Sequence, residues 1–219
     1  MKRVYLLLLS LVMCTMIGAQ NVNTSGSSTW TWGDSPFWNN WGLDVMPSVA
    51  VGISGILGDH LTVPQCGMKI DGNVQFYQKR NGLPQGLLAE TALGYALAGG
   101  GGMPLNYFSY RLSGGYVYPL PHDITIWALI GPNLFVGGGR LYAYYSGTSK
   151  TYYANAADVG IQLKFAAEWH NISAAISYDQ GFVDVIRNSS LTLKSYGVYL
   201  HAGYRLWNIP KNKINLPKL

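Results

Sequence analysis

Three side chains that lie close together in the sequence are of the types that catalyse acyl transfer: Glu168, His170 and Ser173. Such chemistry needs a nucleophile and a base in hydrogen-bond contact, with a third group that orients the base. The surrounding residues alternate between apolar and polar, and a strand with that period places His170 and Ser173 on opposite faces. His60, beside Asp59, is the remaining candidate base for an enzyme. Because of this parity we expect no catalytic residue. The scattered histidines and cysteines have no metal-ligand spacing, so we expect no metal site, and we expect no cofactor.

Within several alternating segments the charged residues all have the same parity, so they share a face with Gly, Ala and Ser. A face of small and charged residues suits a narrow interior better than a solvated exterior. The functional interpretation is a proton or ion path, and the structural interpretation is a packed ionic core. We therefore predict an ionic network inside the fold, made of Asp44, Lys69, Asp71, Glu90, Arg111, Asp158, Lys164, Glu168, Asp179, His201 and Arg205.

The elements that position these residues are eight segments with a period of two, which is typical of strands. No amphipathic helix stands out between them. Charged residues make up 11% of the 219 residues, far below an ordinary soluble domain, and aromatic residues make up 13%. The pattern predicts an all-β, closed, antiparallel, eight-stranded up-and-down barrel, with strands over 42–57, 67–78, 85–98, 106–118, 123–138, 157–169, 172–179 and 196–206.

Two kinds of barrel fit this alternation. A soluble barrel buries its apolar face and binds a hydrophobic ligand, whereas a transmembrane barrel turns that face to lipid. No charged residue lies in mid-strand on the apolar face, which favours the membrane, where a midplane Lys or Arg costs about 2–4 kcal/mol. Long links at 58–66, 99–105, 139–156 and 180–191 alternate with short ones at 79–84, 119–122 and 170–171, as in outer-membrane barrels.

The first twenty residues are typical of a secretory signal. Lys2 and Arg3 precede an apolar run over 4–19 that is short for a transmembrane anchor. We predict a cleaved signal peptide over 1–20, a Trp-rich periplasmic segment over 21–41, the transmembrane barrel over 42–207 and a basic periplasmic tail over 208–219. Both termini of the mature chain then lie in the periplasm, and all seven tryptophans fall at or before the periplasmic strand ends, as in an aromatic girdle.

The closing segment from Tyr196 to Leu206 and the signal ending in Ala19-Gln20 resemble those of small eight-stranded outer-membrane barrels, the class of OmpX and the OmpA membrane domain. This resemblance covers residues 40–207 and implies the same fold and location. The stretch from Tyr107 to Gly139 is also similar to the conjugal-transfer barrel family TraO. Two features depart from the class: Pro47 interrupts the first strand, and the chain continues beyond Trp207.

Aromatic residues outside the strands are the candidate interaction residues: Trp30, Trp32, Trp38 and Trp41 before the barrel, and Tyr142, Tyr144, Tyr145, Tyr152 and Tyr153 in the longest loop. The expected partners are outer-membrane lipid and another protein. No Lys/Arg cluster points to nucleic acid. We predict a structural or interaction module, an accessory subunit of a larger secretion, conjugation or barrel-assembly complex. The alternatives are a stand-alone surface adhesin and an outer-leaflet enzyme that modifies lipid A.

Overall fold

The computed structural model describes residues 31–32, 37–58, 63–99, 105–145, 148–153, 157–184, 193–209 and 214–215. The predicted signal peptide, Trp30 and the pair Asp59-His60 lie outside these residues.

Eight long antiparallel strands form the body of the molecule, each with apolar and polar residues in alternation. They are β2 (Trp41–Gly58), β3 (Val63–Arg80), β4 (Leu83–Gly99), β5 (Leu105–Leu120), β6 (Ile124–Tyr145), β8 (Ala157–Trp169), β9 (Ile172–Asp184) and β10 (Leu193–Tyr204).

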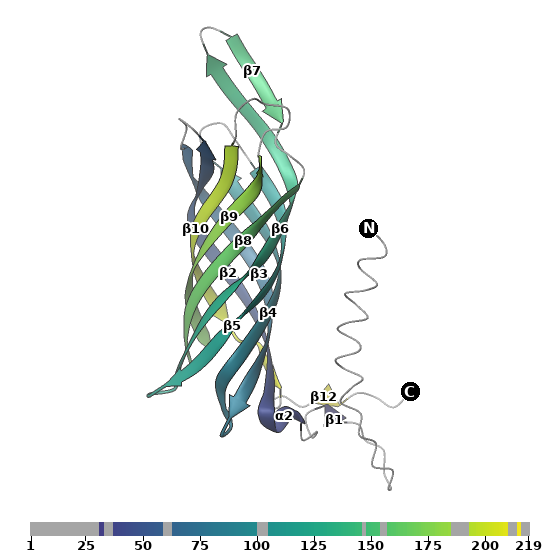
Figure 1. Ribbon diagram of the computed structural model, residues 1–219, viewed down its shortest axis with the longest axis vertical. Helices are drawn as coiled ribbons and strands as arrows, with labels where there is room; N and C mark the ends of the chain where they lie inside the picture. Colours follow the sequence, from purple (N-terminus) through teal and green to yellow (C-terminus); the bar gives the residue numbers. More distant parts are fainter. Residues whose placement is uncertain are drawn as a thin grey trace.

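The sheet closes on itself because its last long strand pairs with its first. Each strand pairs with the next along the chain, and β10 then pairs with β2, from Leu193 opposite Gly58 to Gly203 opposite Ser48. Figure 1 shows the resulting tilted barrel. The predicted eight-stranded up-and-down barrel is confirmed.

Three tight turns gather at one end of the barrel, which we name the turn end; the opposite end is the loop end. Asn81-Gly82 joins β3 to β4, and both residues have positive φ, as a type I′ hairpin turn requires. His122 and Asp123 also have positive φ between β5 and β6, as does His170 between β8 and β9.

The predicted Tyr-rich loop over 139–156 is instead a β-hairpin. Strand β6 continues to Tyr145, and β7 (Thr148–Tyr153) pairs back onto it, from Arg140 opposite Tyr153 to Tyr145 opposite Thr148. Figure 1 shows this β6–β7 hairpin rising beyond the rim at the loop end. The prediction of a loop was wrong because the first half is rich in Tyr and the second in Tyr and Thr, and both residue types favour strands.

Pro47 lies within β2, opposite Gly72 of β3, and does not break the strand. Its nitrogen faces the other neighbour, where β10 ends and β11 (Trp207–Ile209) continues after a one-residue shift in register. The amide of Leu206 donates to the carbonyl of Val45 at this irregularity, and groups at alternate residues of a strand point to the same side. The missing N–H therefore coincides with a bulge.

The described residues nearest to the two ends of the chain, Thr31–Trp32 and Ile214–Asn215, lie at the turn end (Figure 1). The short helix α2 (Phe37–Asn40) leads directly into β2. β11 extends the barrel pairing to Ile209, and β12 (Ile214–Asn215) pairs with β1 (Thr31–Trp32). The sequence predicts a basic periplasmic tail over 208–219. Its described residues, 208–209 and 214–215, pair with β2 and β1 of the same chain.

The position of Pro47 predicts a contrast between two substitutions on one strand. Pro47→Ala should change the free energy of unfolding by less than about 1 kcal/mol, because the bulge offers little for a restored N–H to join. Val49→Pro should cost about 3 kcal/mol, because Val49 lies opposite Ala202 in the intact ladder. Urea unfolding in detergent micelles measures both, and equal losses for the two variants would contradict the bulge.

Candidate functional site

The outer surface of the barrel is a continuous apolar band. Every described strand of the barrel contributes exposed apolar side chains, and Leu93 and Phe108 are each 67% exposed. Soluble monomers seldom expose an apolar patch of more than about 300–600 Å². An apolar surface of this extent is suited to the hydrocarbon core of a bilayer rather than to water.

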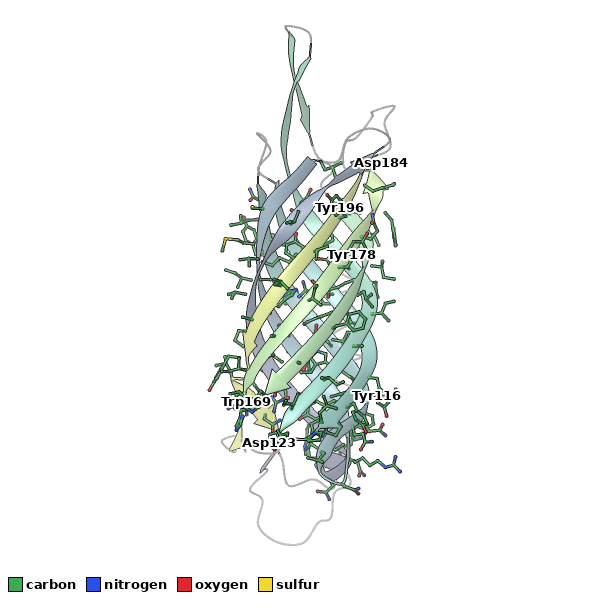
Figure 2. The ribbon with its side chains drawn as sticks, turned by 90° about the vertical axis from the view of Figure 1, so that its left-hand side faces the viewer. Tyr116, Asp123, Trp169, Tyr178, Asp184 and Tyr196 are labelled. Carbon is green, nitrogen blue, oxygen red and sulfur yellow. The ribbon has the colours of Figure 1, made fainter. Side chains whose placement is uncertain are left out.

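Charged side chains on the described outer surface lie only at its two ends. Arg80 and Asp123 are exposed at the turn end, and Asp184 and Lys194 are paired at 3.1 Å at the loop end. Figure 2 shows Asp123 and Trp169 at one end of the barrel and Asp184 at the other. The strand from Ile172 to Phe182 between these levels rises about 25 Å at a tilt of about 40°, which matches the apolar band of a transmembrane barrel.

The inside of the barrel holds the charged residues. The residues of the predicted ionic network face the lumen. All of them are buried except Arg205, which is half-buried. Six acids and four bases occupy this space, and each base contacts at least one acid.

The central layer of the lumen contains two ion pairs. Arg111 Nη2 lies 2.9 Å from Asp71 Oδ2, and the Lys69 ammonium contacts the Asp179 carboxylate. Asp179 also accepts hydrogen bonds from two amides, Asn133 at 3.2 Å and Gln162 at 2.7 Å. These groups come from β3, β5, β6, β8 and β9, so the network links strands that are not neighbours.

His201 extends the central layer. Its Nε2 lies 2.8 Å from Ser177 Oγ, and its Nδ1 lies 3.8 Å from Asp71 Oδ2. The order of serine, histidine and aspartate is that of an acyl-transfer triad. Ser177 and Asp71 are each only 1% exposed, and Asp71 is already paired with Arg111. The three side chains are therefore part of the packed network.

A second ionic cluster closes the turn end. Arg205 Nε lies 2.9 Å from Asp44 Oδ2, and the Arg205 guanidinium also contacts Glu168. The Asn208 amide from β11 contacts Asp44 and lies 3.0 Å from the Tyr77 hydroxyl. The cluster thus ties β11 to β2, β3 and β8 at the place where the register shifts.

An apolar layer separates this cluster from the rest of the lumen. Its members come from six strands and pack into a single cluster: Met46, Tyr77, Leu88, Val117, Trp127, Leu129 and Ala166. Beyond the layer, Lys164 Nζ lies 3.0 Å from Glu90 Oε1, and Gln75 donates to the same carboxylate at 2.7 Å. The layer lies across the polar lumen, which opposes a continuous ion path.

Trp127 belongs to this apolar layer and not to the outer girdle, where the sequence pattern placed all seven tryptophans. It is 5% exposed. The segment from 123 to 138 is apolar on both faces because its turn-end half packs against lipid on one side and against this layer on the other. Trp41 and Trp169 do lie on the outer wall.

The lumen below the loop end contains a cavity of about 50 Å³, lined by Asp158, Tyr107, Tyr199 and neighbours. Asp158 accepts hydrogen bonds from the Phe182 and Val183 amides at 3.2 and 3.0 Å, and from Ser195 Oγ at 2.5 Å. These donors satisfy its carboxylate. The cavity has room for a few water molecules, which is far less than a ligand pocket needs.

The candidate catalytic residues of the sequence are not brought together. His170 is exposed in its turn, with its ring centroid 4.5 Å from that of Trp169. Ser173 faces the lumen and contacts Met46 Sδ at 2.9 Å, and Glu168 is paired with Arg205. Among the described residues, no three His, Cys, Asp or Glu side chains are grouped to hold a metal ion.

The candidate interaction residues fall into two groups. Trp38 and Trp41 lie at the turn end in and beside α2, and Trp32 lies in β1. The tyrosines all lie in the β6–β7 hairpin, where the register pairs Tyr142 with Thr151 and Tyr152 with Leu141. Two faces of the hairpin therefore carry tyrosine positions.

Several polar residues of the site were not singled out by sequence reasoning: Ser177, Asn133, Gln162, Gln75, Tyr77 and Asn208. The only signal for the first four was their shared parity with the charged residues on the same strand. Asn208 lies beyond the alternating segments and gave no signal.

The apolar exterior and the polar, charge-paired lumen define an integral β-barrel of the outer-membrane type. None of the helices among the described residues is long and apolar enough to span a bilayer. No protein-family model matches the chain, and no curated protein matches it either.

Solved structures similar to the chain include Neisserial surface protein A, with 9% identity, a TM-score of 0.44, and 76% of this chain and 97% of that one covered. Ail, the attachment invasion locus protein of Yersinia pestis, has 14% identity and a TM-score of 0.43, over 77% and 99% of the two chains. The N-terminal β-barrel domain of Pseudomonas aeruginosa OprF has 13% identity and a TM-score of 0.35, over 73% and 97%.

The central ion pairs predict a large loss of stability when one partner is removed. Arg111→Leu should lower the free energy of unfolding by about 3–5 kcal/mol, because it leaves Asp71 buried without its cation. Asp123→Asn, in the exposed turn between β5 and β6, should cost less than about 0.5 kcal/mol. Urea titration of the folded band in detergent measures both variants. A loss below about 1 kcal/mol for Arg111→Leu would contradict the assigned pairing.

The apolar layer predicts a barrel that does not conduct. In planar bilayers the purified protein should give no steady ohmic steps, whereas an open porin in the same bilayers serves as a positive control. Regular current steps from the wild-type chain would show that the layer opens.

Proposed function

We propose that this protein is an outer-membrane interaction module, in which a sealed barrel holds the β6–β7 hairpin outside the membrane for contact with a partner. The observation that carries the proposal is the hairpin itself, six residue pairs that extend β6 beyond the rim. A closed barrel with a packed lumen supports anchoring rather than transport.

The hairpin is built as a contact element. Neither β7 nor the part of β6 from Arg140 to Tyr145 has a second strand neighbour among the described residues, so no described strand covers either edge of the hairpin. An isolated two-stranded hairpin is only marginally stable in water. Its tyrosine positions supply the amphipathic rings that are enriched at protein interfaces.

The tight turns support an orientation with the turn end in the periplasm and the loop end outside the cell, since outer-membrane barrels have short periplasmic turns. Both termini of the mature chain then lie in the periplasm. The hairpin faces the exterior in this orientation.

Two kinds of partner fit this arrangement. As an accessory subunit, the protein would hold another component of a secretion, conjugation or barrel-assembly complex. As a stand-alone adhesin, it would bind a surface outside the cell. Described residues of the predicted Trp-rich segment and basic tail make contacts within the chain itself: α2 packs against the barrel wall, and β12 pairs with β1. The adhesin interpretation gains weight from this.

The hairpin can be shortened without touching the barrel. Joining Leu141 to Tyr152 through Asn-Gly leaves the two pairs nearest the rim and should leave the heat-resistant folded band unchanged. Wild-type protein, extracted from outer membranes in mild detergent, should have a native mass above that of one chain, and the shortened variant should not. Asp123→Asn, in an exposed turn at the opposite end, is the control variant.

The same variants separate the two kinds of partner. A single-chain mass for the wild type, with surface adhesion of cells lost on shortening, would favour the adhesin. A single-chain mass with unchanged adhesion would overturn the proposal.

A further inference from the structure

A cluster of aromatic rings attaches the segment before β2 to the outer wall of the barrel. The Phe76 ring on β3 stacks on Trp41 with centroids 4.7 Å apart and on Phe37 at 5.9 Å. Phe37 also stacks on Trp41 at 6.1 Å and meets Trp38 edge-on at 5.1 Å. We name these four residues the aromatic cluster.

The aromatic cluster continues the lipid-facing band. Phe76 lies opposite Leu43 in the pairing of β2 with β3, and both residues are on the outer parity of their strands. All four rings remain only half-buried by protein, so part of each is accessible at the lower edge of the band. Residues 37 and 38, which precede the strand pairing, therefore add apolar surface to the outer wall of the barrel.

The short helix has a polar side as well. Asn39 and Asn40 are exposed, whereas the Phe37 ring stacks on Phe76 of the wall and contacts the Trp38 ring. This separation of rings from amides within four residues suits a boundary between apolar and aqueous phases, where Trp is enriched.

Basic groups border the aromatic cluster on its turn-end side. Lys79 Nζ donates to the Trp38 carbonyl at 3.3 Å, which ties β3 to the helix. Arg80 follows and is exposed, beside the uncharged turn Asn81-Gly82. Two cations just beyond the aromatic cluster complement the charge of lipid phosphates.

We propose that residues 37–41, with Phe76, Lys79 and Arg80, form an interfacial anchor that is seated at the headgroup–acyl boundary of the phospholipid leaflet at the turn end. Lipid is the occupant because the aromatic cluster is continuous with the membrane-facing wall. A protein partner would have to bind at the depth that headgroups occupy. The anchor fixes the depth of the barrel and holds the entering chain on its outer wall.

Fluorescence quenching by brominated lipid tests the anchor in the full-length mature chain. Three variants each keep one tryptophan, with Phe in the other positions: Trp38 for the anchor, Trp169 as the outer-wall control and Trp127 as the lumen control. Each is refolded into phosphatidylcholine vesicles whose acyl chains carry bromine either near the headgroup or near the methyl end.

Bromine near the headgroup should quench Trp38 at least about threefold more than Trp127, and within about a factor of two of Trp169. Bromine near the methyl end should quench Trp38 less. Quenching of Trp38 no greater than that of Trp127, together with strong quenching by aqueous acrylamide, would overturn the proposal and place the segment in water or under a protein partner.

A second measurement needs only single substitutions, in case a variant with one tryptophan does not fold. Wild-type chain labelled with 5-fluorotryptophan, in lipid nanodiscs, gives ¹⁹F resonances for Trp38 and Trp127, which the variants Trp38→Phe and Trp127→Phe assign. Lipids spin-labelled near the headgroup should broaden the Trp38 resonance severalfold more than that of Trp127. Equal broadening of the two would overturn the anchor.

Discussion

The structure depends on one constraint: every polar group that crosses the membrane must find its partner inside a ring of eight strands. Closure of β10 onto β2 satisfies the backbone. The side chains then divide by parity, and the charged half enters a lumen only wide enough for side chains to fill. Ion pairs such as Arg111 with Asp71 follow from this lack of space, since a buried charge needs an opposite charge in contact with it.

The same constraint explains why so much of the fold could be predicted. A period of two survives in any strand that is apolar on one face, and the empty outer face distinguished a membrane barrel from a soluble one. The parity of Lys69 or Glu168 was readable because each lies among apolar neighbours on its own strand. The contacts across the lumen could not be predicted, because the tilt and stagger of the strands decide which side chains of distant strands lie at the same height. The contact of Lys69 on β3 with Asp179 on β9 is of this kind.

Three differences between prediction and structure have local causes. Residues 139–156 were interpreted as a loop because the lipid-facing alternation ends there, although the Tyr- and Thr-rich runs on either side of Ser146-Gly147 favour a hairpin. Trp127 was placed outside because Trp is common at membrane interfaces, and only the three-dimensional structure shows the apolar layer that it completes. The tail pairs with β1 through so few residues that no periodic pattern could have revealed it.

The charges of the lumen also have a consequence before the barrel exists. A chain bound for an outer membrane first passes through the inner one, where a sufficiently apolar segment would stop as a helix. Strand β8 carries Asp158, Lys164 and Glu168 within thirteen residues. Since each charged residue at the centre of such a helix disfavours insertion by about 2.5–3.5 kcal/mol, the residues that later fill the interior keep the nascent strand from lodging in the wrong bilayer.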